Sequence, residues 1–139
     1  MTEDQEPKLI ANRWQCPDGT VLQSMHRYDY VTHTDTITGE VCMVDGGIYG
    51  CCRISGNLKN LCVYSNDPHE LQREFFHWGT YGIDGKQPRT FIAAKDMTTE
   101  HIEAVLETQD RIAPEIKELF LNELAYRKEL NALHANEEC

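Results

Sequence analysis

The hydrophobic period of the sequence changes once, near residue 97, and this change constrains the fold more than any other feature. From Trp14 to Phe91 the chain is rich in Val, Thr, Tyr and Ile, and turn-forming pairs such as Thr38-Gly39 interrupt it. After Met97, apolar residues recur at the spacing of an amphipathic helix. The pattern predicts an α+β fold. An antiparallel β-sheet meander should fill the N-terminal two-thirds, and two C-terminal α-helices should pack on the sheet, on a second subunit, or on both.

Short strands are expected at 20–25, 28–35, 40–45, 48–54, 61–64, 75–81 and 89–94. Asp67 as N-cap and Pro68 at the first helical position predict a short helix that continues through Arg73. Thr98 as N-cap predicts a helix over about 98–109, and Pro114 in a first turn predicts a longer one over about 113–132.

The length of 139 residues predicts one folded domain, because a chain of this size can bury one modest core but not two. We expect a single α+β domain at 13–133, between a flexible acidic arm at 1–12 and a flexible tail at 134–139. On the last helix, Leu121 and Leu133 lie off the main apolar stripe, which favours a homo-oligomer.

The charge balance argues against nucleic acid as a partner. Acidic residues outnumber basic residues by 23 to 13, and the resulting net charge of -10 repels phosphate groups. The same excess suits a protein that docks on a basic surface, although charged runs more often only solvate a face.

The sequence indicates neither a membrane span nor an export signal. No stretch approaches the roughly 18 to 20 consecutive apolar residues of a bilayer-spanning helix, and the amino-terminal MTEDQEP is acidic, unlike a secretory signal. We therefore expect a cytosolic protein whose cysteines are reduced and which has no membrane partner.

Six cysteines and six histidines supply potential metal ligands, but their spacing follows no zinc pattern. There is no C-x₂-C pair, and on a strand the neighbours Cys51 and Cys52 would point to opposite faces. We expect no metal and no cofactor.

Nucleophilic catalysis by cysteine needs a histidine base nearby. Hairpins could bring Cys16 near His26, or Cys42 near His33, but no local signature of a catalytic cysteine accompanies either pair. We expect no catalytic residues.

The segment 26–30 offers one wall of a candidate ligand site, with Arg27 and Tyr28 as its binding residues. In a strand, His26, Tyr28 and Tyr30 would share one face, and Arg27 and Asp29 the other. The alternative is aromatic packing on one face with a solvated ion pair opposite. If His26 and Arg27 lie in the preceding turn, the alternation is broken.

The segment 75–89 suggests a nucleotide site more than any other. Phe76, Trp78 and Tyr81 could stack on a planar base, and Lys86 or Arg89 could pair with a phosphate. The segment matches no phosphate-binding fingerprint, and a hairpin with an aromatic core contact and a glycine-rich turn explains it equally well.

Arg127, near the end of the last helix, completes the candidate ligand-binding set. Its positive charge suits the negative end of the helix dipole. If two subunits pack through this helix, its planar guanidinium could instead hold an anionic ligand in a shared pocket.

Two blocks of the chain resemble a widespread family of small tailed-bacteriophage proteins, over roughly residues 13 to 130. They are Trp14-x-Cys16-Pro17-Asp18-Gly19-Thr20 leading to 26–31, and Trp78-Gly79-Thr80-Tyr81-Gly82 leading through Asp84-Gly85-Lys86-Gln87-Pro88 to 95–97. The order of elements is also similar to that of phage anti-Thoeris proteins, which sequester cyclic ADP-ribose-type signals; this second resemblance rests on architecture and length. Both resemblances imply an accessory protein that binds a host enzyme or a host signal.

The leading functional hypothesis is a host-takeover or anti-defence protein in the cytoplasm of an infected bacterium. It would act by binding, as a homo-oligomer that sequesters a nucleotide-derived signal such as a cyclic ADP-ribose isomer. The alternative is an acidic protein–protein inhibitor of a host enzyme. A second alternative, a small Cys/His-dependent or zinc-dependent enzyme, has no motif in its favour.

Overall fold

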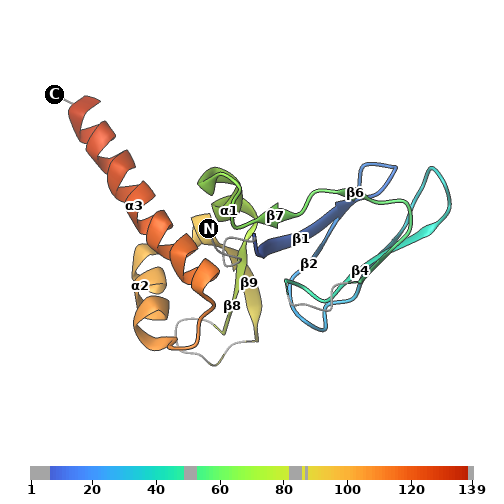
Figure 1. The fold of residues 1–139 in the computed structure, drawn as a ribbon, viewed down its shortest axis with the longest axis horizontal. Coiled ribbons are helices and arrows are strands. Elements are labelled where there is room, and N and C mark those ends of the chain that lie inside the picture. Colours follow the sequence, from blue (N-terminus) through green and yellow to red (C-terminus); the bar gives the residue numbers. More distant parts are fainter. Residues whose placement is uncertain (1–6, 49–52, 82–85, 87, 138–139) are drawn as a thin grey trace, which may run out of the picture. The chain divides into compact units, whose positions relative to one another are not determined.

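The computed structural model describes residues 7–48, 53–81, 86 and 88–137, with the backbone alone for 133–137. Antiparallel β-sheets fill the N-terminal part and helices the C-terminal part, which confirms the predicted α+β class (Figure 1). Contacts group the chain into two compact units, Met1–Asp67 and Pro68–Cys139, and each is described by itself. The single domain at 13–133 stays a prediction.

The N-terminal unit contains two small antiparallel sheets. In the first, β1 (Leu9–Gln15) pairs with β2 (Val21–Ser24), β6 (Lys59–Asn60) and β7 (Val63–Tyr64). In the second, β4 (Val41–Asp45) lies between β3 (Val31–Thr34) and β5 (Arg53–Ser55). A buried cluster of Cys16, Leu22, Cys42 and Val44 lies in this unit.

Strand β1 corrects the predicted acidic arm at 1–12, which is wrong for its last residues. Ile10, Ala11 and Asn12 are all buried, and β1 pairs with three other strands. A strand that is buried at consecutive positions shows no apolar alternation. Because Asn12, Arg13 and Gln15 are polar and show no alternation, the sequence pattern did not predict this central strand.

The predicted strand at 48–54 is only partly described, because residues 49–52, including Cys51 and Cys52, lie outside the described residues. Within the predicted 28–35, the strand begins only at Val31. Residues 26–29 form a turn in which the Asp29 N–H donates to the His26 carbonyl (3.0 Å). The strand geometry expected for 28–30 is therefore wrong.

Ser24, a buried side chain, ties this turn to the end of β4. Its hydroxyl donates to the Asp29 carbonyl (2.7 Å) and accepts from the Gly47 N–H (2.8 Å). A Cβ atom on Gly47 would lie 2.7 Å from the His26 carbonyl carbon, and Gly47 has a φ of 59°. Only glycine fits this position without a shift of the backbone.

The C-terminal unit starts with α1 (His69–Phe75), followed by the hairpin of β8 (His77–Thr80) and β9 (Thr90–Ala93). A short 3₁₀ turn, η2 (Ala94–Asp96), leads into α2 (Thr99–Thr108) and α3 (Pro114–Glu137). Figure 1 shows α2 beside the first turns of α3. The buried residues Ile102 and Val105 of α2 and Ile116, Leu119 and Phe120 of α3 contribute the core.

The helix starts test the predicted caps. The Thr98 hydroxyl accepts from the His101 N–H (3.1 Å), which confirms it as the N-cap of α2, and Pro114 is the first residue of α3. Asp67 is not a cap: its carboxylate accepts from the Tyr64 N–H (2.7 Å), and Pro68 occupies the cap position of α1. Helix α3 continues past 132, so the tail predicted as flexible is helical through Glu137.

Within the described part of the chain, no helix is both long enough and apolar enough to cross a bilayer.

Candidate functional site

The predicted ligand-binding residues fall into the two different units. Arg27 and Tyr28 lie in the N-terminal unit, in the turn before β3, and Tyr28 is 81% exposed. Phe76, Trp78, Tyr81, Lys86, Arg89 and Arg127 belong to the C-terminal unit. Each group is therefore described within its own unit.

Phe76 and Trp78 pack inside the C-terminal unit. Phe76 is 4% exposed, and both rings meet the Phe120 ring of α3 edge to face, at centroid distances of 5.9 and 5.6 Å. Edge-to-face contacts of this kind stabilise a core. The aromatic hairpin contact, which was the alternative interpretation of this segment, accounts for both residues.

The rest of the segment lies on the surface. Tyr81, Lys86 and Arg89 are exposed, and the Arg89 guanidinium lies 5.1 Å from the centroid of the Phe91 ring. A Cβ atom on Gly79 would lie 3.2 Å from the Phe91 ring. Packing therefore explains this glycine, while the predicted glycine-rich turn at 82–85 lies outside the described residues.

Arg127 connects α3 to the start of α2. Its Nε donates to Glu123 (2.7 Å), its Nη1 to the Thr99 hydroxyl (2.9 Å), and its Nη2 to backbone carbonyls that include Met97 (2.7 Å). Further contacts reach the carbonyls of Ala94 and Lys95. These bonds occupy most of the five guanidinium N–H groups, so the structure gives Arg127 a clamping role within the unit.

Glu123 is the centre of a buried ionic cluster that the sequence did not reveal. Its side chain is fully buried and accepts hydrogen bonds from His69 (2.9 Å), Arg73 (2.7 and 2.9 Å) and Arg127 (2.7 Å). Burial alone would raise the pKa of Glu123, but the hydrogen bonds from Arg73, Arg127 and His69 outweigh it and hold the pKa below its usual value. The one sequence feature that could have predicted part of this cluster is the spacing of four between Glu123 and Arg127, which allows an ion pair within one helix.

A second polar cluster lies in the N-terminal unit, between the β1–β2 turn and the β3–β4 hairpin. Potential metal-ligand atoms of Cys16, Asp18 and His33 all lie within 4.8 Å of one another. The His33 Nε2 and the Asp18 carboxylate are 2.8 Å apart. Cys42 is the register partner of His33 across the hairpin, which confirms that those two residues are neighbours.

The electrostatics of this cluster do not suit a nucleophile. Burial, the hydrogen bond with Cys42 and the nearby Asp18 and Asp35 raise the pKa of the Cys16 thiol to about 11. Hydrogen bonds from His33 and from the Thr36 and Thr20 N–H groups hold the pKa of Asp18 well below its usual range. A catalytic cysteine needs a lowered thiol pKa and some exposure, and Cys16 has neither.

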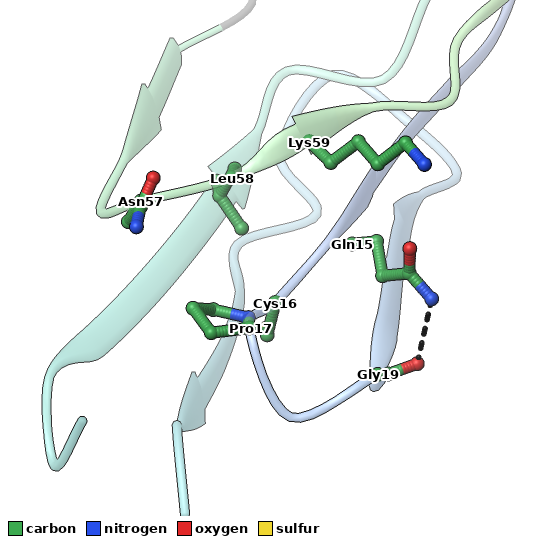
Figure 2. A pocket seen from close by; sticks show the side chains of 7 residues that line it. All are labelled: Gln15, Cys16, Pro17, Gly19, Asn57, Leu58 and Lys59. Atoms are coloured by element: carbon green, nitrogen blue, oxygen red, sulfur yellow. Dashed lines mark hydrogen bonds between the residues drawn. The ribbon is translucent and has the colours of Figure 1, made fainter. Parts of the chain in front are cut away.

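A pocket of about 350 Å³ opens beside the same turn (Figure 2). It is lined by Gln15, Cys16, Pro17, Gly19, Asn57, Leu58 and Lys59. The Gln15 side chain donates to the Gly19 carbonyl (3.3 Å), and Lys59 is the single charged residue among the seven. None of the seven is aromatic, so this pocket offers no stacking surface for a base.

The C-terminal unit also presents an acidic face, which we define as Glu100, Glu103 and Glu107 of α2. All three side chains are exposed, while Ile102 and Val105 of the same helix are buried. Spacings of three and four place the carboxylates on one side of the helix, over about 10 Å of its length.

No protein-family model matches the chain, and neither the comparison with curated proteins nor the comparison with solved structures returns a match.

Proposed function

We propose that this protein acts by binding, as a bacteriophage accessory protein that docks on a basic host protein through the acidic face of α2. The bacteriophage setting and the cytoplasm of the infected host come from the sequence resemblance alone. A homo-oligomer belongs to the same proposal, supported by Leu121 and Leu130, which are exposed on α3. The side chain of Leu133 lies outside the described residues.

The observation that carries the proposal is that α2 has one buried apolar side and one exposed acidic side. Its apolar residues are committed to the core, whereas Glu100, Glu103 and Glu107 form one exposed anionic side. The net charge of the whole chain, -10, has the same sign. Complementary charge of this kind steers a basic partner and selects against acidic ones.

The test compares two pairs of charge-neutralising substitutions. Glu103→Gln with Glu107→Gln removes two charges from the acidic face, and Glu70→Gln with Glu74→Gln removes two exposed charges from α1. Tagged proteins are used to capture host proteins, and the captured proteins are quantified by mass spectrometry. We expect one basic host protein to be captured by the wild type and by the α1 variant and to be depleted with the α2 variant. Equal capture by both variants would contradict the proposal.

Sequestration of a nucleotide-derived signal is the second candidate function. The exposed Tyr81, Lys86 and Arg89 support it, because an aromatic ring and two cations suit a base and a phosphate. Phe76, Trp78 and Arg127 are engaged inside the unit and do not contribute. A cyclic ADP-ribose isomer at saturating concentration should raise the melting temperature of the wild type, and Tyr81→Ala with Arg89→Ala should abolish the rise. An unchanged melting temperature of the wild type removes this candidate.

A further inference from the structure

Two separate hairpins of the N-terminal unit bring potential metal ligands together. The β1–β2 turn carries Cys16 and Asp18, and the β3–β4 hairpin carries His33, which completes a cluster of three ligand atoms within 4.8 Å of one another. Cys42 is the cross-strand partner of His33. We propose that Cys16, Asp18, His33 and Cys42 bind one zinc ion, which staples these two hairpins together. The proposal is independent of the docking function, which concerns the other unit.

The distances within the cluster are close to those of a zinc site. Two ligand atoms of a tetrahedral zinc ion, at bond lengths of about 2.0 to 2.3 Å, lie roughly 3.3 to 3.8 Å apart. The His33 Nε2 and the Asp18 carboxylate are 2.8 Å apart, and one ligand atom each of Cys16, Asp18 and His33 lies within 4.8 Å of the other two. Shifts of about 0.5 to 1 Å would bring these three atoms to the spacing of zinc ligands.

Cys42 is the proposed fourth ligand, and because it lies outside the group of ligand atoms within 4.8 Å of one another, its side chain would have to shift to reach the ion. Cys42 faces His33 across the β3–β4 pair, and residues that pair in this way project from the same face of the sheet. Its thiol is hydrogen-bonded to that of Cys16, and both cysteines are buried. A Cβ atom on Gly56 would lie 3.0 Å from the Cys42 sulfur, so the surrounding backbone holds this thiol closely.

The surroundings orient the ligands. The Asp18 carboxylate accepts from the Thr20 N–H (2.9 Å) and from the Thr36 N–H (2.9 Å) and hydroxyl (3.0 Å). The Asp18 N–H in turn donates to the Asp35 carboxylate (2.7 Å), which is fixed by the N–H groups of the β3–β4 turn. Ligating carboxylates in metal sites are held by outer hydrogen bonds of this type.

The ligand set selects zinc. Two thiolates and an imidazole suit zinc and disfavour magnesium and calcium, which take oxygen ligands. A unit of this size, 67 residues, also has a small core, and small folds commonly need a staple such as a structural metal. The sequence pattern did not predict the site because Cys-x-Asp and a cross-strand His–Cys pair differ from the usual C-x₂-C spacing.

The experiment uses the full-length protein, stripped with a chelator and titrated with zinc alone. Native mass spectrometry should show one zinc ion per chain, and X-ray absorption of the zinc-loaded wild type should show two sulfur and two nitrogen or oxygen ligands. Cys16→Ser and His33→Gln should each weaken zinc binding at least tenfold. The control is Cys62→Ser, which removes the thiol of the residue just before β7, near the Arg13 carbonyl, and it should bind zinc as the wild type does.

Three outcomes would overturn the proposal. They are no zinc retained by the wild type after desalting, a coordination shell without two sulfur atoms, and equal zinc affinity in Cys16→Ser and Cys62→Ser. The absorption measurement needs no variant, so it decides the question even if Cys16→Ser fails to fold. In the first outcome, the cluster is a hydrogen-bonded turn in which Asp18 links the two hairpins without a metal ion.

Discussion

At the scale of single residues, Glu123 is the most informative position. It is a fully buried carboxylate whose oxygens accept from two guanidinium groups and one imidazole. Taking a charge out of water is costly unless the partners are in place, so the cluster is far more sensitive to the loss of one member than a surface ion pair. The same bonds fix α1, α3 and the start of α2 relative to one another.

Replacing Glu123 by Gln should destabilise the C-terminal unit by about 3 kcal/mol, because the change leaves Arg73 and Arg127 without their counter-charge. Amide hydrogen exchange of α3 measures this loss within the unit. Glu118→Gln, an exposed position on the same helix, is the control and should change stability by less than about 0.5 kcal/mol. Equal losses in both variants would show that the cluster contributes nothing.

The lowered pKa of Glu123 also predicts how stability depends on pH. A carboxyl whose folded pKa is depressed contributes stability above its unfolded pKa, about 4.3 for Glu, and loses it as the pH falls through the folded value. Exchange protection of α3 in the wild type should therefore fall as the pH drops below about 4. Glu123→Gln should show a shallower dependence. Parallel pH curves for the two proteins would contradict the assigned cause.

At the scale of elements, the sequence pattern located most helices and turns but missed β1. Thr98 and Pro114 mark the starts of α2 and α3 because caps act locally, through one or two bonds to the adjacent turn. Strand β1 pairs with the neighbouring β2 and also with β6 and β7, which are distant in sequence, and its three consecutive buried residues follow no period. Local pattern could not identify it.

The same distinction explains which site residues could be predicted. The aromatic residues Phe76 and Trp78 were found as a group, but their direction into the core depends on Phe120, which is more than forty positions away in the sequence. Cys42 and His33 were recognised as possible hairpin neighbours because a hairpin sets its register locally. Cys16 and Asp18 come from another hairpin, and only the folded unit brings them to His33.

At the scale of the whole molecule, each unit carries one of the two proposals. The N-terminal unit contains the candidate zinc site, and the C-terminal unit contains the buried ionic cluster and the acidic face of α2. The hydrogen bonds of the ionic cluster bear on binding, because a surface that is already ordered loses less entropy when a partner docks. The central claim is that this surface acts through its charge on a basic host protein.

The most direct test measures the rate of association between the full-length protein and its captured host partner at increasing salt. Exposed charges at an interface act mainly on the association rate and its salt dependence. The account predicts a steep fall in rate with salt for the wild type and for Glu70→Gln with Glu74→Gln, and a shallower fall for Glu103→Gln with Glu107→Gln. The same salt dependence in all three proteins would contradict a role for the acidic face of α2.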